Sequence, residues 1–115
     1  MQKILQQLNQ EVGVKGSMVI TSDGLVVISE LSEELDEEIV AAMASSTIKY
    51  TKQSLKLLGT EKFDRLILTA TYGRIVFIDI ELACLLVVTD KKINIDFTLL
   101  EIDGAAQRLK KTWKM

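Results

Sequence analysis

The chain contains no histidine and no proline, and it has a single cysteine and few aromatic residues (5%). Histidine is the commonest general base and the commonest transition-metal ligand, so its absence argues against catalysis and against a bound metal. A lone cysteine, Cys84, cannot form an intramolecular disulfide. Cys84 lies in an apolar run, where burial raises a thiol pKa and leaves the thiol inert, so we expect a core residue. The sequence therefore predicts no enzyme, no metal and no other cofactor.

Long hydrophobic runs and clustered positive charge are also missing. The longest apolar run covers residues 82–88, far below the roughly 20 residues that span a bilayer. The first residues lack the apolar stretch of a signal peptide. The formal net charge is −2, without the grouped Lys and Arg that neutralise phosphates. We expect a cytoplasmic protein that neither inserts into membranes nor binds nucleic acid.

What the sequence does contain is typical of one compact domain. It has 115 residues, of which 48% are apolar and 26% charged, and no linker, repeat or low-complexity tract divides it. A chain of this length buries about two-thirds of its unfolded surface. We expect one domain over residues 1–115.

The first half predicts a helix, a hairpin and a long helix. Apolar residues at positions 4, 5, 8 and 12 are spaced for a helix that stops at Gly13. Two β-rich runs, 16–22 and 25–29, flank Asp23-Gly24, a pair typical of a two-residue type I′ turn. An acidic segment, 30–38, then leads into a helix over 34–58, with lysines near its end and Gly59 after it.

The second half predicts three strands and a closing helix. The strands are expected at 63–71, 74–80 and 84–89, with Tyr72-Gly73 as a tight turn. Residues 99, 102, 106, 109 and 113 step by three and four along the last helix, which contains Gly104. The order is α-β-β-α-β-β-β-α. Short connections favour antiparallel pairing, so we expect an α/β (α+β) fold: a five-stranded antiparallel sheet with helices on both faces.

The long helix has an apolar arc about twice the width of 100° that a helix on one sheet requires. Two stripes make up this arc: one is Ile39, Met43, Ser46, Tyr50 and Leu57, and the other is Val40, Ala44, Ile48, Thr51, Leu55 and Leu58. Either the helix is deeply buried, or one stripe packs on a second subunit. Small residues at 41, 42 and 44–46 favour the second interpretation, but spacing does not decide which stripe has which role.

The third predicted strand points to the same conclusion. One face carries Leu66, Leu68 and Ala70, and the other carries Phe63, Arg65, Ile67, Thr69 and Thr71. An exposed edge with so few charges favours aggregation. Pairing with a symmetry-related copy removes that liability.

Two other motifs have ordinary explanations. Residues 13–17 (GVKGS) place lysine before the second glycine, which is not the order of a phosphate-binding P-loop. The acidic segment 30–38 lacks the glycine and alternating ligands of a calcium loop, so a solvated helix start is favoured. The basic residues Arg108, Lys110, Lys111 and Lys114 are expected to be the solvated end of the last helix.

These features together resemble the Roadblock/dynein light chain family, in its bacterial or archaeal single-domain form. The resemblance rests on the opening helix before Gly13 to Gly16, the hairpin 19–25 (VITSDGL), the long helix with Ala41 to Ala44, the Tyr72-Gly73 hairpin, and the apolar fifth strand with its closing helix. One departure is the segment 91–96 (KKINID), where the family often has glycine. The resemblance implies a profilin-like fold and a homodimer that joins through the middle helix and the third strand.

The resemblance also implies function. Family members regulate NTPases or act as adaptors, so we expect a non-enzymatic homodimer that binds and modulates a small Ras-like GTPase or other NTPase. Alternatives are a scaffold subunit of a larger complex, or a PAS- or GAF-like small-molecule sensor, which needs a cavity between sheet and helix. The expected dimer and partner surface comprises Val40, Ala41, Ala44, Ile48, Lys49, Thr51, Lys52, Leu55, Arg65, Ile67 and Thr69.

Overall fold

The computed structural model describes residues 1–71 and 73–113. Its elements follow the predicted order: α1 (Gln2–Leu8), β1 (Val14–Ile20), β2 (Val26–Leu31), α2 (Glu37–Lys56), β3 (Arg65–Thr69), β4 (Gly73–Asp79), β5 (Cys84–Asp90) and α3 (Ile95–Trp113). The predicted α/β class and element order are therefore confirmed.

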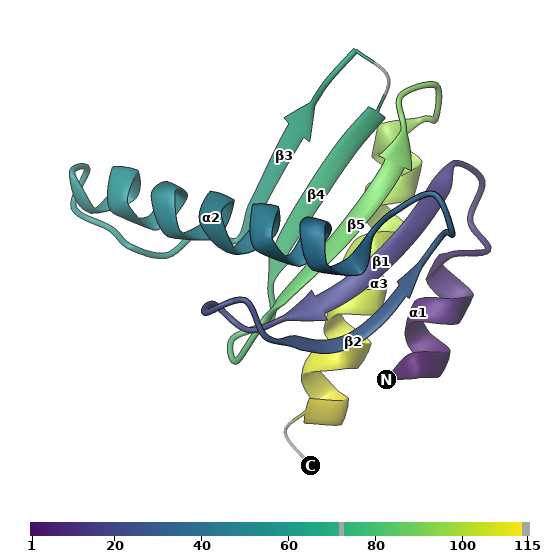
Figure 1. Cartoon of the computed structure of the whole chain (residues 1–115), viewed down its shortest axis with the longest axis horizontal. Coiled ribbons are helices and arrows are strands. Elements are labelled where there is room, and N and C mark those ends of the chain that lie inside the picture. The colour runs from purple at the N-terminus through teal and green to yellow at the C-terminus, as the bar shows by residue number, and fades with distance from the viewer. Residues whose placement is uncertain (72, 114–115) are drawn as a thin grey trace.

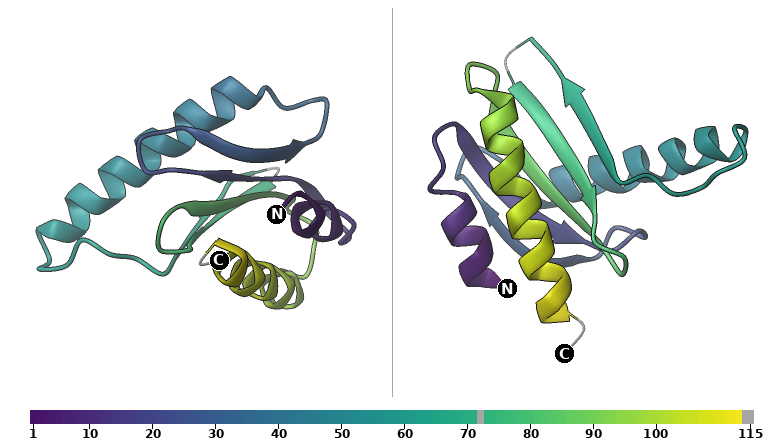
Figure 2. Two further views of the ribbon diagram at one scale, coloured as in Figure 1. Left: turned by 90° about the horizontal axis from the view of Figure 1, so that it is seen from below. Right: turned by 180° about the vertical axis from the view of Figure 1, so that it is seen from behind.

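The five strands form one antiparallel sheet in the order β2-β1-β5-β4-β3 (Figure 1). Strand β5 is central, between β1 and β4, because the chain returns from β4 through β5 to pair with β1. Two strands, β2 and β3, are left at the edges. Helix α2 crosses one face of the sheet, and α1 and α3 cover the other, as the views in Figure 2 show.

Both faces of the sheet are buried, and each belongs to a separate core. The core under α1 and α3 includes Leu5, Val76, Leu85, Val87, Ile102 and Leu109. The core under α2 includes Met18, Ile20, Val40, Ile48, Phe77 and Leu86. Side chains of a strand point alternately to the two faces, so β4 and β5 supply both cores with apolar residues at successive positions.

The ends of α2 follow the sequence signals closely. Asp36 is the N-cap, and its side chain accepts a hydrogen bond from the Ile39 amide at 3.1 Å. At the other end Gly59 adopts a φ of 88°, and the Thr60 amide donates back to the Leu55 carbonyl at 3.1 Å. This left-handed glycine completes a helix stop that the sequence predicted.

The first helix is shorter than predicted. It ends at Leu8, and Val12 is 87% exposed rather than part of its apolar stripe. The Asn9 side chain donates to the Glu30 carbonyl at 2.7 Å and accepts from the Ser17 hydroxyl at 2.8 Å. These bonds to β1 and β2 hold the chain at the point where the helix ends, so the spacing of Val12 was misleading.

The first hairpin does not have the predicted type I′ turn. That turn requires a positive φ at both central residues, and in the described part of the chain the only non-glycine residue with one is Glu81. The loop is wider, because the Thr21 hydroxyl donates to Asp23 at 2.5 Å and accepts from the Leu25 amide at 3.1 Å. The hydrogen bond from Thr21 also lowers the pKa of the exposed Asp23 carboxyl.

The last helix begins at Ile95, within the segment where the sequence departs from the family pattern. Asn94 supplies the missing start signal, because its side-chain oxygen accepts from the Asp96 amide at 3.1 Å and the Phe97 amide at 3.3 Å. Of the predicted features, Tyr72, the Trp113 side chain and Lys114 lie outside the described residues. No helix in the described part of the chain is long and apolar enough to cross a membrane.

Gly104 lies inside α3, where glycine costs about 1 kcal/mol relative to alanine. A methyl group there would be 3.5 Å from the Arg108 guanidinium, which is an ordinary contact. Gly104→Ala is therefore expected to raise the free energy of unfolding by about 1 kcal/mol, measured by urea denaturation. Gly73→Ala is the contrasting variant, because its methyl group would lie 2.8 Å from the Thr89 carbonyl oxygen and should destabilise the sheet.

Candidate partner-binding surface

The structure decides which stripe of α2 faces the sheet. Val40, Ala41, Ala44 and Ile48 are all buried and pack in the core beneath the helix. These four residues of the expected partner surface are therefore interior residues of the subunit, and the expectation is revised at those positions. The small side chains at 41 and 44 permit close approach to the chain's own sheet rather than to a second helix.

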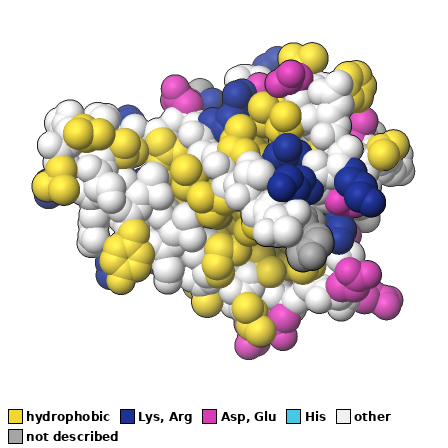
Figure 3. Space-filling view, turned by 90° about the horizontal axis from the view of Figure 1, so that it is seen from above, with side chains coloured by type: hydrophobic (Ala, Val, Ile, Leu, Met, Phe, Trp, Pro, Cys, Tyr) yellow, Lys and Arg dark blue, Asp and Glu magenta, His cyan; other side chains and the backbone are white. Residues whose placement is uncertain are grey.

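The adjoining part of the arc is exposed or half-buried and carries no charge. We call it the outer stripe, and it consists of Met43, Ser46, Thr47, Tyr50, Thr51, Ser54 and Leu55, which line a shallow groove of about 550 Å³. The Thr47 hydroxyl donates to the Met43 carbonyl at 2.9 Å, which satisfies that group within the helix. Figure 3 shows apolar side chains gathered along this helix and the adjoining sheet.

The second half of α2 extends past its own sheet (Figure 1). Its last buried residue is Ile48, although the helix continues to Lys56. Tyr50 is 63% exposed, and Leu57, just beyond the helix, is 89% exposed. Two turns of the helix thus have apolar side chains without any strand of this chain beneath them.

Strand β3 is the free edge of the sheet on the same side. Leu66 pairs with Phe77 and Leu68 with Ile75, so both leucines lie on the face that carries α2. Ile67 pairs with Val76 and lies on the α3 face, where it is 37% exposed. The predicted split of this strand into two faces is confirmed for these residues.

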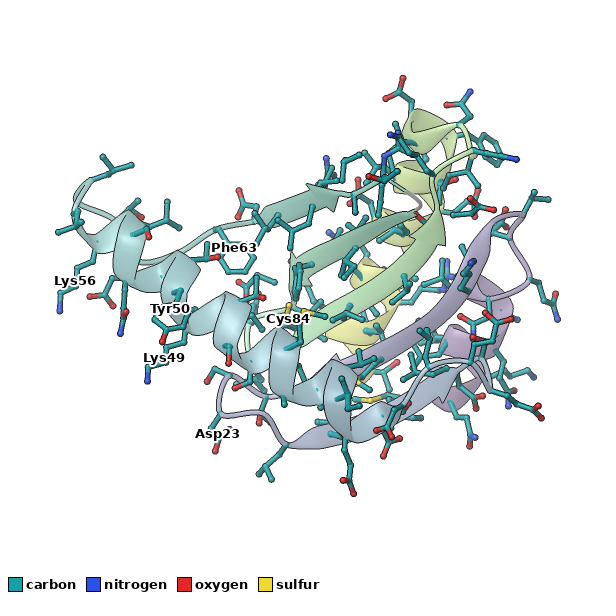
Figure 4. The ribbon with its side chains drawn as sticks, turned by 45° about the horizontal axis from the view of Figure 1, so that its top comes forward. Asp23, Lys49, Tyr50, Lys56, Phe63 and Cys84 are labelled. Atoms are coloured by element: carbon teal, nitrogen blue, oxygen red, sulfur yellow. The ribbon has the colours of Figure 1, made fainter. Side chains whose placement is uncertain are left out.

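Phe63 does not belong to the face on which the sequence placed it. It precedes β3 and packs against the core under α2. Figure 4 shows its ring between the helix and the sheet, whereas Lys49 and Tyr50 point away from the sheet.

The remaining expected residues are at or near the surface. Lys49 and Lys52 are exposed on α2, Thr51 and Leu55 are half-buried, and Arg65 and Thr69 are exposed on β3. The residues that the sequence did not select for this surface are Met43, Ser46, Thr47, Tyr50, Ser54 and Leu68. The stripe containing half-buried Met43 and exposed Tyr50 was visible in the periodicity, but nothing in the spacing separated it from the buried one.

Two arginines near the free edge are held by the chain itself. Arg65 forms an ion pair with Asp103 of α3 at 2.5 Å. Arg74 donates a hydrogen bond to the Lys91 carbonyl at 3.0 Å. Each guanidinium is therefore directed toward its own subunit.

The site offers a partner an apolar surface with basic residues beside it. Among the described residues no group of three His, Cys, Asp or Glu side chains could hold a metal ion. The geometry is a free strand edge beside an uncharged helix stripe, with Lys49 and Lys52 on the flank of that helix.

This architecture defines a profilin-like α/β module with an open sheet edge. A family model described as the Roadblock/LC7 domain matches residues 1–90, and the chain belongs to that family. Three proteins of Methanocaldococcus jannaschii, among them Uncharacterized protein MJ1340, are 32% identical to it over 108 residues; for MJ1340 this covers 94% of this chain and 95% of the relative.

Solved structures show the same fold at low sequence identity. MglB of Myxococcus xanthus has a TM-score of 0.90 at 16% identity, covering 97% of this chain and 86% of that one. A Roadblock/LC7 domain from Streptomyces avermitilis has a TM-score of 0.88 at 13% identity, covering 100% and 98%. LokiProfilin1, solved with rabbit actin, has a TM-score of 0.64 at 17% identity, covering 96% and 94%.

Cys84 is buried at the start of β5, as the sequence predicted. Burial, reinforced by the negative charge of Asp79, raises the pKa of its thiol to about 12. At pH 8 the thiol is therefore protonated, and it should react with a disulfide reagent such as DTNB at least about a hundredfold more slowly in the folded than in the urea-unfolded chain. Rapid labelling of the folded protein would contradict this environment.

Proposed function

We propose that residues 1–115 form one Roadblock-like domain and that the chain is a non-enzymatic, cytoplasmic homodimer. The homodimer binds and modulates a small Ras-like GTPase or other NTPase. The observation that carries the proposal is the free β3 edge beside the uncharged outer stripe of α2. Family membership supports the regulatory role, since Roadblock proteins are adaptors and NTPase regulators.

A second copy of the chain fits the β3 edge. The outer side of β3 has unpaired backbone groups, and Arg65 is the only charged residue in the strand. Such an edge pairs readily with another strand, and a two-fold axis lets each copy cover the other's edge. The opposite edge, β2, has contacts with α1 and carries Glu30. This asymmetry favours β3 as the dimer edge.

The part of α2 that extends past its own sheet supports the same dimer. A helix of 20 residues is about 30 Å long, but its buried residues end at Ile48. In a two-fold dimer joined at β3, the second half of each helix would extend toward the partner's sheet. Leu68, which is 40% exposed on that face, and the outer stripe would then be covered.

The arrangement of charges bears on how a GTPase would be regulated. Arg65 and Arg74 each have a partner within the subunit, and this argues against either as an arginine finger. We propose that the dimer acts by repositioning groups of the GTPase itself. Lys49 and Lys52 are exposed on the flank of α2 and would meet an acidic surface of the GTPase.

The dimer can be tested at the free edge. Ile67→Asp places a charge next to the partner strand and should raise the dimer dissociation constant by at least about tenfold, measured by light scattering during dilution. Val27→Asp on β2 is the matched control, because Val27 is 40% exposed and Ile67 is 37% exposed. A wild-type chain that is monomeric at all concentrations would overturn the proposed assembly.

The partner can be tested by reversing charge on α2. Lys49→Glu/Lys52→Glu should weaken capture of a Ras-like GTPase by roughly tenfold or more in a pull-down, while Lys111→Glu, on the exposed end of α3, should not. The assay compares GTPase loaded with GDP and with a non-hydrolysable GTP analogue. Capture of a partner complex that is insensitive to nucleotide would instead support the scaffold alternative.

A further inference from the structure

A charged cleft lies at the end of the sheet, beside α2. Its walls are Lys52 of α2, Lys62 and Phe63 of the segment after α2, and Asp79 and Glu81 at the β4–β5 turn, and its volume is about 380 Å³. This size is within the range of small-molecule sites. None of these residues belongs to the outer stripe or to β3, so the cleft does not overlap the proposed dimer edge, but it shares Lys52 with the proposed GTPase contact.

A small recess continues inward from the same walls. It has a volume of about 60 Å³ and adds five residues to the lining: Ser22, Ile48, Leu82, Ala83 and Cys84. Ser22 and Leu82 are exposed, whereas Ile48, Ala83 and Cys84 are buried. The cleft thus has ionic groups around its mouth, and the buried part of the recess is lined by Ile48, Ala83 and Cys84.

The turn that carries Glu81 is held in an uncommon conformation. Glu81 has a φ of 75°, and it is the only non-glycine residue with a positive φ in the described part of the chain. A non-glycine residue in this region costs about 1 kcal/mol or more. The strain is located at the wall of the cleft, and it sets the direction from which the Glu81 side chain leaves the backbone.

The balance of charge in the cleft identifies the class of ligand. Two ammonium groups, Lys52 and Lys62, would repel a metal cation, and two carboxylates, Asp79 and Glu81, would repel a phosphate. A molecule that carries both an ammonium and a carboxylate forms favourable charge-assisted hydrogen bonds with both pairs. An apolar arm on that molecule would lie against Phe63 and enter the recess.

We propose that this cleft binds a small zwitterion with an apolar side group, which is the chemistry of an aliphatic or aromatic α-amino acid. The carboxylate of the ligand faces Lys52 and Lys62, and its ammonium faces the Asp79 carboxylate at the β4–β5 turn. The cleft thereby supplies a small-molecule cavity at the end of the sheet beside α2, which bears on the sensor alternative, in addition to the proposed dimer surface.

The test uses the full chain labelled with nitrogen-15 and titrated with L-leucine and L-phenylalanine. At least one should cause saturable amide shifts in residues 52, 62–63 and 79–84, with a dissociation constant of about 1 mM or tighter. N-acetyl-L-leucine lacks the ammonium and L-leucinamide lacks the carboxylate, so each should bind at least about tenfold more weakly than L-leucine.

Two variants remove one charge from each pair without touching the proposed dimer surface. Lys62→Met and Asp79→Asn should each weaken binding by at least about tenfold, whereas Lys111→Met should leave it unchanged. Thermal melts and light scattering verify that each variant folds and keeps the oligomeric state of the wild type. Failure of the amino acids to bind to a correctly assembled protein, or equal binding of the blocked analogues, would overturn the inference and leave the dimer proposal intact.

Discussion

A sheet that is apolar on both faces is the constraint on which this structure depends. Met18 and Val19 are adjacent in β1 and fully buried on opposite faces, as are Val76 and Phe77 in β4. Fully burying one such side chain contributes about 1.5–3 kcal/mol, so neither face can be left in water. Helices α1 and α3 cover one face. On the other face the covering helix is α2, and it crosses the strands rather than running along them (Figure 1).

The incomplete cover given by α2 accounts for both surfaces to which we assign binding. One is the outer stripe, where uncharged helix residues stand beside half-buried Leu66 and exposed Leu68. The other is the charged cleft at the end of the sheet, where Lys52 and Phe63 approach the β4–β5 turn. Their chemistry differs sharply: the first excludes charge and suits another protein surface, and the second concentrates charge of both signs and suits a small ligand.

The sequence predicted the element order, the ends of α2 to within three residues (34–58 expected, Glu37–Lys56 observed) and the buried cysteine, because each depends on local signals such as periodicity, charge order and the glycine stop. It failed where tertiary contacts override such signals. Val12 has helical spacing but lies beyond a helix that Asn9 ends through bonds to β1 and β2. The roles of the two α2 stripes also depend on tertiary packing, since Val40 and Met43 differ little in hydrophobicity. The charged cleft joins residues 52, 62 and 79–81, which no local pattern connects.

The segment between α2 and β3 links the two surfaces physically. Lys62 and Phe63 line the cleft, and β3, the proposed dimer edge, begins two residues later at Arg65. A ligand in the cleft that orders this segment would favour the dimer by the same factor by which dimerisation favours the ligand. A ligand that binds monomer and dimer with equal affinity would not shift the equilibrium between them, however tightly it binds. Coupling between the cleft and the dimer edge therefore depends on whether the segment from Lys62 to Arg65 has a different conformation in the monomer and in the dimer. The strength of ligand binding or of dimerisation alone does not decide it.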